Sequence, residues 1–453
     1  MTHPLNMPDL EARSPWSVHQ GIHQVKISPP RLKVNSVIRV SGSKSLTNRA
    51  LIIAAMAEGI SRIEGILRSD DAYWCIESLR ELGIDLAIEG DTAIVTGCGG
   101  KWPAPRGQLY VGAAGTVARF LPAALAAGQG EWTLTGSKRM SERPIEQLLM
   151  ALTDQGAGLQ YLNQEHAYPF VLQGNGLNGG NVQLAGNLSS QFVSGLLVAA
   201  PYANQPMTIH MQGVTVQREY VNMTIDMMRS FGVEAAEDLE QNIYHIPSGK
   251  YSACTIKLEP DISTCCYFWA MAALTEGYIR TEGIYADRTR QPDIEMLEVL
   301  ERMGCTVVRG EDGAVEVHGT SQLRGGFELS MARWSDQTLT IAAMAPFADA
   351  PITMKDAAHI RHHECDRISA ICTELRKLSI RVEEHADGLT VYPGHPEPAL
   401  LDTYDDHRMA MALSLIGLKA EGITILDPGC ISKTCPDYFS RLRELGAGIH
   451  FFA

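Results

Sequence analysis

The sequence predicts an α/β protein of two globular domains, each made of three β-α-β-α-β-β units with buried helices and outer sheets, closing on an interdomain cleft. Three observations predict this fold. The chain has 453 residues, too many for one ordinary domain. One pattern of helices and strands recurs six times, at a spacing of roughly seventy residues that suits a large supersecondary unit. The last copy is one strand short, and the start of the chain can supply that strand.

Each copy begins with an apolar helix that has small residues on every face, which is typical of closely packed, buried helices. These helices are expected at residues 51–57, 121–127, 195–201, 267–273, 339–345 and 412–418. A short strand follows, as at 61–66, 132–135 and 423–426, and then an amphipathic helix, as at 76–82, 294–303 and 368–378. Gly83, Gly232 and Gly304 suit left-handed ends for such helices, and a hairpin, as at 307–317, closes the unit.

The chain ends decide how the units divide between domains. The sixth unit stops at 449–453 with a single closing strand, so we expect the early strand at 23–27 to complete its sheet, with Val25 and His450 in the same domain. Residues 1–22 are then an N-terminal extension. Domain 1 comprises 23–43 and 261–453, and domain 2 comprises 44–260.

Composition limits the classes of partner. Apolar residues make up 45% of the chain and the net charge is −14, which argues against general binding to nucleic acid or acidic membranes. The ten cysteines form no C-x-x-C pair, so we expect reduced thiols in a cytoplasmic protein. Residues 1–22 lack the apolar core of a signal peptide, and no later apolar run is long enough to span a membrane. We expect a monomer whose partners are small anionic substrates.

The stretch from Ser41 to Arg49 predicts an anion site. It follows the β-branched run 37–40 and opens a helix with Lys44, several hydroxyl side chains and an arginine, so backbone N–H groups and two cations converge. It is not a P-loop, because the second glycine ahead of the lysine is missing. The alternative is an ordinary capped helix start with solvated charges.

Further cations occur at the other helix starts or on the links that precede them. If these starts face one cleft, only a polyanionic ligand would offset the repulsion between the cations. Two carboxylates, Asp336 and Glu364, lie among them in the sequence and suit proton transfer. The cations are Lys44, Arg49, Arg119, Arg143, Arg367, Arg408 and Lys433.

Seven ordered motifs resemble the 5-enolpyruvylshikimate-3-phosphate synthase family of enolpyruvyl transferases, over roughly residues 23–447. They are Gly42-Ser-Lys-Ser45 with Asn48-Arg49, Ala114-Gly115-Thr116 with Arg119, Arg139-Met-x-Glu-Arg143-Pro144, Ser189-Ser190-Gln191, Glu259-x-Asp261-x-Ser263, Asp406-His407-Arg408-Met409-Ala410-Met411 and Lys433-Thr434-x-Pro436-Asp437. That family's fold of two three-unit globules agrees with the repeat.

The resemblance implies transfer of the enolpyruvyl group of phosphoenolpyruvate to the 5-hydroxyl of shikimate 3-phosphate, without cofactor or metal. By position, phosphoenolpyruvate would be held by Lys44, Gly115, Arg143, Gln191, Arg367, Arg408 and Lys433. The acceptor would be held by Lys44, Ser45, Arg49, Ser189, Ser190, Gln191, Tyr220, Asp336, His359 and His363. Asp336 would be the base on the acceptor hydroxyl, and Glu364 with Lys44 the acid at the methylene carbon.

Three acceptor-side positions depart from the family pattern. His359 and His363 stand where the family usually has Asn and Lys, and Gln217 where it usually has Ser. Two interpretations remain open: a divergent synthase in which His363 partly replaces the lysine, or an enolpyruvyl transferase with a different anionic alcohol acceptor. A non-catalytic anion-binding paralogue is a third. A possible metal cluster is also present, but the nearby cations and the absence of a known zinc spacing oppose this interpretation. Its residues are His359, His362, His363 and Cys365.

Overall fold

The computed structural model describes residues 8–186 and 189–453 and divides the chain into two compact lobes. Lobe 1 takes in the described part of Met1–Leu10, together with Trp16–Ser41 and Pro260–Ala453. Lobe 2 takes in Glu11–Pro15 and Gly42–Glu259. Two segments of the predicted N-terminal extension therefore belong to different lobes. Among the described residues, no helix has the length and apolar character needed to cross a membrane.

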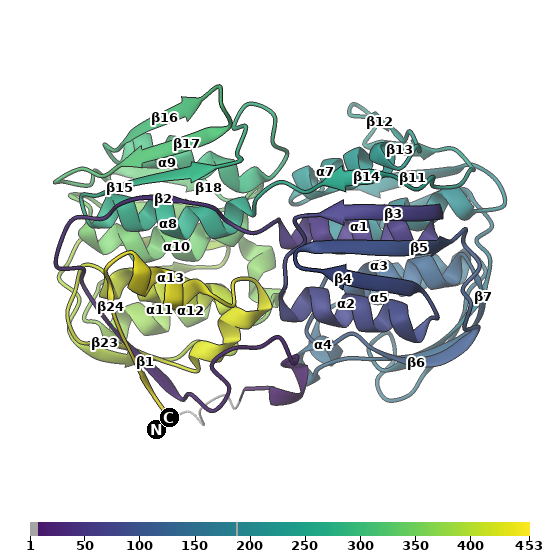
Figure 1. Cartoon of the computed structure of the whole chain (residues 1–453), viewed down its shortest axis with the longest axis horizontal. Helices are drawn as coiled ribbons and strands as arrows, with labels where there is room; N and C mark the ends of the chain where they lie inside the picture. Colours follow the sequence, from purple (N-terminus) through teal and green to yellow (C-terminus); the bar gives the residue numbers. More distant parts are fainter. Residues whose placement is uncertain (1–7, 187–188) are drawn as a thin grey trace. The chain divides into compact units, whose positions relative to one another are not determined.

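Lobe 2 contains three four-stranded sheets and the helices that pack on them (Figure 1). Its elements in the first repeat are α1 (Lys44–Met56), β3 (Glu58–Glu64), α2 (Asp70–Glu81), β4 (Asp85–Glu89) and β5 (Thr92–Cys98). The second has β6 (Arg106–Tyr110), α3 (Val117–Ala126), β7 (Gln129–Thr135), α4 (Lys138–Glu142), α5 (Glu146–Asp154), β8 (Gly158–Tyr161) and β9 (Phe170–Asn175). The third has β10 (Gly180–Ala185), α6 (Ser190–Ala199), η2 (Ala200–Tyr202), β11 (Met207–Gln212), α7 (Arg218–Ser230), β12 (Ala236–Asp238) and β13 (Ile243–Ile246), and β14 (Thr255–Lys257) ends the lobe.

Lobe 1 also has three four-stranded sheets. After the short η1 (Leu10–Ala12) come β1 (Gln24–Ser28) and β2 (Asn35–Ile38). The fourth repeat has α8 (Ile262–Leu274), β15 (Tyr278–Glu282), η3 (Pro292–Glu295), α9 (Met296–Arg302), β16 (Thr306–Gly310) and β17 (Ala314–His318). The fifth has β18 (Phe327–Ser330), η4 (Ser335–Gln337), α10 (Thr338–Met344), η5 (Ala345–Phe347), β19 (Ile352–Lys355), η6 (Ala358–His362), α11 (Arg367–Lys377), β20 (Val382–His385) and β21 (Gly388–Val391). The sixth has β22 (Ala399–Leu401), α12 (His407–Gly417), β23 (Ile423–Leu426), η7 (Pro428–Lys433), α13 (Tyr438–Glu444) and β24 (Gly448–Phe452).

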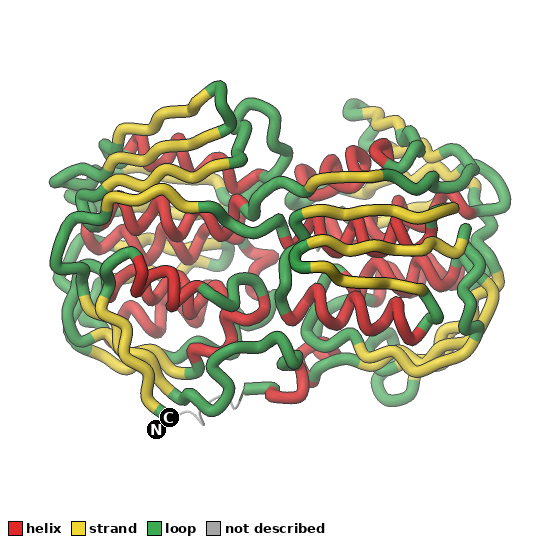
Figure 2. Tube along the Cα trace, in the orientation of Figure 1, coloured by secondary structure: helices red, strands yellow, loops and turns green. Residues whose placement is uncertain are grey.

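The six sheets share one pattern of pairing, as the predicted repeat requires. Each sheet contains one parallel pair, and the remaining strands add antiparallel, as in the order β6-β7-β9-β8. In four of the sheets the parallel pair is formed by the strands directly before and after the buried helix. Within each lobe the strands lie outside and the helices inside (Figure 2). Gly83, Gly232 and Gly304 follow the amphipathic helices with φ of 81°, 84° and 96°, which confirms their left-handed conformation.

The start of the chain completes the last sheet. β1 lies between β23 and β24 and pairs antiparallel with both, with Lys26 opposite His450 and Val25 opposite Phe451. The prediction that Val25 and His450 share one domain is therefore confirmed. The hairpin predicted at 307–317 is confirmed as β16 and β17.

The strand read directly before α1 needs a correction. We expected the β-branched run 37–40 to form a strand of domain 1; the strand is β2, which is shifted to Asn35–Ile38 and pairs in parallel with β15 in lobe 1. The corresponding place beside β3 is taken by β14, from the other end of lobe 2. The two crossings of the chain thus exchange one strand each, so that neither β2 nor β14 pairs with the strand that follows the next helix along the chain.

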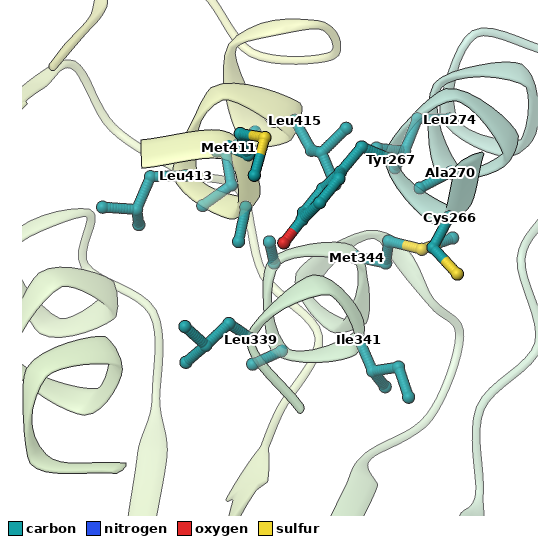
Figure 3. Close-up of a cluster of buried hydrophobic side chains, with 14 of the residues drawn as sticks. Cys266, Tyr267, Ala270, Leu274, Leu339, Ile341, Met344, Met411, Leu413 and Leu415 are labelled. Atoms are coloured by element: carbon teal, nitrogen blue, oxygen red, sulfur yellow. The ribbon is translucent and has the colours of Figure 1, made fainter. Parts of the chain in front are cut away.

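The three buried helices of lobe 1 pack against one another. α8, α10 and α12 carry almost wholly buried apolar side chains (Figure 3). The ring of Tyr267 on α8 lies between Met344 of α10 and Met411 of α12 in this core, and its hydroxyl accepts a 3.5 Å hydrogen bond from Arg408 Nη1. This bond connects the apolar core to the charged residues at the start of α12.

Candidate active site

Arg367 is the centre of a charged cluster in lobe 1. It is the first residue of α11 and is 2% exposed. Its Nε and Nη2 donate to Asp406 at 2.7 and 3.2 Å, its Nη2 also donates to Glu364 at 2.9 Å, and its Nη1 donates to Asp336 at 3.0 Å. Burial lowers the pKa of this guanidinium, but the carboxylates outweigh burial and raise it above its ordinary value. Arg367 is therefore a fixed cation.

Asp336 bridges two arginines. It lies in the 3-10 turn η4 before α10, and its Oδ1 accepts from Arg367 while its Oδ2 accepts from Arg408 Nη2 at 2.7 Å. Arg408 is the second residue of α12, and Asp406 caps that helix by accepting from its backbone N–H at 2.8 Å. The sequence placed Asp336 and both arginines at helix starts, and the fold brings them into direct contact.

Glu364 links Arg367 to a third cation. Its Oε1 lies 2.8 Å from Lys433 Nζ, and its other oxygen accepts from Arg367. Lys433 ends the 3-10 helix η7 and is 7% exposed. The carboxylates of Asp336, Glu364 and Asp406 thus balance the charges of Arg367, Arg408 and Lys433 in one network of lobe 1. An anion that binds the three cations would compete with these carboxylates for their N–H groups.

The two histidines predicted to bind the acceptor are neutral near pH 7. Burial lowers the pKa of His359 to about 4, and its Nε2 lies 2.7 Å from Ser335 Oγ. Burial and the adjacent Arg367 hold the pKa of His363 well below its ordinary value. His363 Nδ1 lies 3.0 Å from Arg367 Nη1, and since a guanidinium can only donate, Nδ1 accepts and the proton of the neutral ring is on Nε2. His363 therefore offers a hydrogen-bond donor rather than a charge.

Lys44 begins α1 in lobe 2. Its Nζ lies 3.5 Å from Asp71 Oδ2, and Asp71 is the second residue of α2. Asp71 is 2% exposed, and the lysine side chain is 16% exposed. The helix start thus presents a cation that a buried carboxylate holds in place, rather than a fully solvated lysine. Ser45 follows in the first turn of the same helix.

Arg49 is built into the interior of lobe 2. It is 1% exposed, donates to Thr224 Oγ1 at 2.8 Å and to the backbone oxygens of Ser45 and Tyr220 at 2.9 Å each, and lies 5.0 Å from the centroid of the Phe120 ring. Burial lowers its pKa to about 10. Its hydrogen bonds tie α1 to α7, the helix that carries Tyr220.

Gly115 and Arg143 are in contact. Arg143 follows α4, is 8% exposed, and lies so close to Gly115 that a Cβ there would be 3.1 Å from both terminal nitrogens of the guanidinium. Arg119, by contrast, is 2% exposed and donates to Met140 Sδ and to the Pro144 backbone oxygen, both at 2.8 Å. Arg119 therefore holds the segment that presents Arg143.

The start of α6 carries the predicted hydroxyl and amide side chains. Ser189 is the N-cap, and its Oγ accepts from the Gln191 backbone N–H at 3.2 Å. Ser190 is 2% exposed, whereas Gln191 is half-buried. The preceding two residues, 187 and 188, which were part of the same predicted helix start, lie outside the described residues.

Comparisons with known proteins assign the family. The sequence model of the family described as EPSP synthase (3-phosphoshikimate 1-carboxyvinyltransferase) matches residues 29–442. The chain belongs to the EPSP synthase family. It is 51% identical over 446 residues to 3-phosphoshikimate 1-carboxyvinyltransferase 2 of Halalkalibacterium halodurans, covering 98% of this chain and 99% of that protein. It is 43% identical over 415 residues to the 3-phosphoshikimate 1-carboxyvinyltransferase of Trichormus variabilis, covering 91% and 96%.

Solved structures agree with the EPSP synthase fold. The structure of EPSP synthase from Acinetobacter baumannii superposes with a TM-score of 0.81 at 24% identity, covering 95% of this chain and 100% of that one. The enolpyruvyl transferase NikO from Streptomyces tendae gives a TM-score of 0.75 at 20% identity, covering 95% and 99%. At these identities the two structures support the predicted fold of this family and nothing further.

Sequence reasoning missed two carboxylates of this EPSP synthase family member. Asp406 was quoted within a motif but given no role, although it is fully buried and binds Arg367. Asp71 was not singled out, because an acidic residue in a first helical turn is the usual capping pattern. Only an acid two residues before a helix-start arginine, as in Asp406-His407-Arg408, could have indicated a cap. In residues 8–186 and 189–453, no group of His, Cys, Asp and Glu side chains is arranged to hold a metal ion.

Proposed function

We propose that the chain transfers the enolpyruvyl group of phosphoenolpyruvate to the 5-hydroxyl of shikimate 3-phosphate and releases phosphate. The observation that supports this best is the lobe 1 cluster, in which Asp336 and Glu364 contact Arg367, Arg408 and Lys433. A carboxylate and a phosphate on a three-carbon frame require several cations, and addition to a vinyl carbon requires a base and an acid close to them.

The roles of the residues follow from this chemistry. Asp336 takes the proton of the acceptor hydroxyl as the hydroxyl oxygen bonds to C2 of phosphoenolpyruvate. Glu364, with Lys44, delivers a proton to C3. The tetrahedral intermediate then loses a proton from C3 while the C2–O bond to phosphate breaks, so the product regains the double bond and phosphate leaves. No oxidant, reductant, cofactor or metal enters this balance.

The substrate-binding roles extend the same proposal to both lobes. In lobe 1, Arg367, Arg408 and Lys433 bind phosphoenolpyruvate, and His359 and His363 bind the acceptor. In lobe 2, Lys44, Gly115, Arg143 and Gln191 bind phosphoenolpyruvate. The acceptor contacts Lys44, Ser45, Arg49, Ser189, Ser190, Gln191 and Tyr220 there. The interior position of Arg49 supports an indirect role, in which it fixes Ser45 and Tyr220 through their backbone oxygens.

The test is phosphate release from phosphoenolpyruvate with and without shikimate 3-phosphate. We expect release only with both substrates, and a loss of about 10²–10⁴-fold in kcat for Asp336→Asn, as for removal of a general base. Asp356→Asn is the matched control, because Asp356 is exposed and adopts a left-handed conformation (φ 63°) that asparagine tolerates. Equal activity of the two variants would contradict the role of Asp336.

A second candidate is an enolpyruvyl transferase for a different anionic alcohol. The neutral state of His359 and His363 favours it, because these positions offer hydrogen bonds where the family usually offers an amide and a cation. This candidate predicts phosphate release with another phosphorylated or carboxylated cyclic alcohol and none with shikimate 3-phosphate. A non-catalytic anion-binding paralogue would release no phosphate with any acceptor.

We also propose that the protein is a cytoplasmic monomer. All ten cysteines are free thiols, as expected in a reducing compartment. Size-exclusion chromatography with light scattering, at concentrations near those of the activity assay, tests the monomer.

A further inference from the structure

A buried carboxyl group lies behind the phosphoenolpyruvate-binding arginines. Asp293, in the 3-10 helix η3, is 1% exposed. Its Oδ2 is hydrogen-bonded to Ser263 Oγ on α8 and accepts from Gln337 Nε2 at 3.0 Å. Its Oδ1 is buried and has no hydrogen-bond partner among the described residues. Neither the proposed reaction nor the substrate-binding roles use this group, so its presence needs an explanation.

Ser263 accepts a hydrogen bond from Arg408 and donates one to Asp293. Arg408 Nη2 lies 3.3 Å from Ser263 Oγ, and a guanidinium can only donate, so the serine oxygen accepts there. The hydroxyl proton of Ser263 is then donated to Asp293. Gln337 is oriented as well, because its Oε1 accepts from Thr340 Oγ1 at 2.8 Å and its amide nitrogen therefore faces Asp293.

The same arginine is held on its other side by the proposed base. Arg408 Nη2 donates both to Ser263 Oγ and to Asp336 Oδ2, so two acceptors fix this nitrogen. Without Asp293, the Ser263 hydroxyl could rotate and direct its own proton toward Arg408, where two donors would then oppose each other. The carboxyl group of Asp293 thus determines whether Ser263 acts as an acceptor.

We infer that Asp293 is a positioning residue for Arg408: by accepting the Ser263 hydroxyl proton, it holds the arginine in the orientation that binds phosphoenolpyruvate. The inference rests on the proposed function, in which Arg408 contacts that substrate. Asp293 would thus support the reaction without touching the reacting atoms. The side chain of Asp293 acts only through Ser263 and Gln337.

The electrostatics are consistent with this role. The pKa of Asp293 is raised to about 7, chiefly by burial and also by the charge of Asp336, although Arg408, Ser263 and Gln337 oppose the shift. The neighbouring thiol of Cys266 donates to the backbone oxygen of Asp293 rather than to its carboxyl group. The polar contacts of the carboxyl group with the described residues therefore lead toward Arg408.

The experiment compares Michaelis constants for the two substrates in single and double variants. Ser263→Ala and Asp293→Ala should each raise the KM for phosphoenolpyruvate about tenfold, the usual effect of losing a hydrogen bond to a charged group, and leave the KM for shikimate 3-phosphate within about twofold. The double variant should be no worse than either single one, because both changes remove the same chain of hydrogen bonds. Asp293→Asn, which keeps an acceptor, should restore most of the affinity. Cys266→Ser is the matched control and should behave as wild type.

Several results would overturn the inference. An unchanged KM for phosphoenolpyruvate in Ser263→Ala, equal rises for both substrates, or effects that multiply in the double variant would each do so. If Asp293→Ala does not fold, the same test can be made by comparing Ser263→Ala with the double variant Ser263→Ala/Asp293→Asn. The second change should then cause no further rise in the KM for phosphoenolpyruvate. A wild-type chain that releases no phosphate rejects the proposed function instead. In that case a crystal structure of Ser263→Ala decides, since an unmoved Arg408 guanidinium would reject the positioning role.

Discussion

Replacing Asp406 by asparagine should remove the main anchor of the lobe 1 cluster. Asp406 is fully buried and accepts two hydrogen bonds from Arg367, at 2.7 and 3.2 Å, besides capping α12 through the Arg408 N–H. Asparagine keeps the size of the side chain and is itself a good N-cap residue. Its amide N–H₂ would, however, face the Nε–H or Nη2–H of the arginine, and the buried guanidinium would lose one of its three carboxylates.

The magnitude follows from the burial of the pair. Removing one partner of a buried ion pair costs about 3–5 kcal/mol, because the other charge is left without compensation. Arg367 retains Asp336 and Glu364, so we expect the lower end, about 3 kcal/mol of unfolding free energy. The arginine would also turn toward those two acids. The KM for phosphoenolpyruvate should therefore rise at least tenfold.

The assay is urea unfolding followed by tryptophan fluorescence, combined with steady-state kinetics in both substrates. Asp405→Asn is a matched control, because this neighbouring residue is partly exposed and adopts φ of 54°, which asparagine accepts. Its effect should stay within about 0.5 kcal/mol, as for most surface changes. If Asp406→Asn is as stable as this control and binds phosphoenolpyruvate equally well, Asp406 does not anchor Arg367 in the way described.

Three further outcomes are expected. The pKa of His359 is lowered to about 4 in the folded protein, so the unfolded chain takes up a proton at a higher pH than the folded protein does. The free energy of unfolding should therefore be constant above about pH 6.5 and should fall by up to about 3 kcal/mol as the pH falls toward 4. In urea unfolding at pH 7 and pH 5, His359→Asn should lose less stability at the lower pH than the wild-type protein does. Because His363 is neutral too, the KM for the acceptor should stay flat from pH 6.5 to 8, and a steady rise would show that it acts as a cation. Gly115→Ala should displace the guanidinium of Arg143 by a few tenths of an ångström, and should raise the KM for phosphoenolpyruvate severalfold without loss of stability. Gly107→Ala is the control, because its Cβ would lie 3.9 Å from the nearest atom, and it should change neither the KM nor the stability.

The sequence predicted the repeat well because its signal is local. A run of small apolar residues, an amphipathic helix and a terminal glycine each leave a pattern within one window, and the six sheets confirm the order of elements. The missing strand of the last sheet was found by counting strands rather than from any residue of β1. The sequence placed the first strands with the second half of the chain, but it did not predict that β2 pairs with β15 and β14 with β3, because pairing partners so far apart in the chain leave no local pattern.

The site shows the same division between local and distant information. Lys44, Asp336, Arg367 and Arg408 could be identified from their places at helix starts and from the family motifs. The environment of each group could not, since burial and partners depend on contacts between distant segments. The sequence therefore did not predict the strongly lowered pKa of His363, which we considered as a substitute for lysine, or the interior position of Arg49.

The placement of β1 between β23 and β24 sets the order in which the protein can fold during synthesis. This strand is synthesised early, but Gln24 pairs with Leu426 and Phe452. Its sheet can therefore form only after almost the whole chain has been synthesised. Residues 42–259, by contrast, have their sheets complete once β14 has emerged. Residues 42–259 can therefore fold first, while β1 and β2 still expose unpaired backbone groups that could pair with other chains until their partners in lobe 1 have been made.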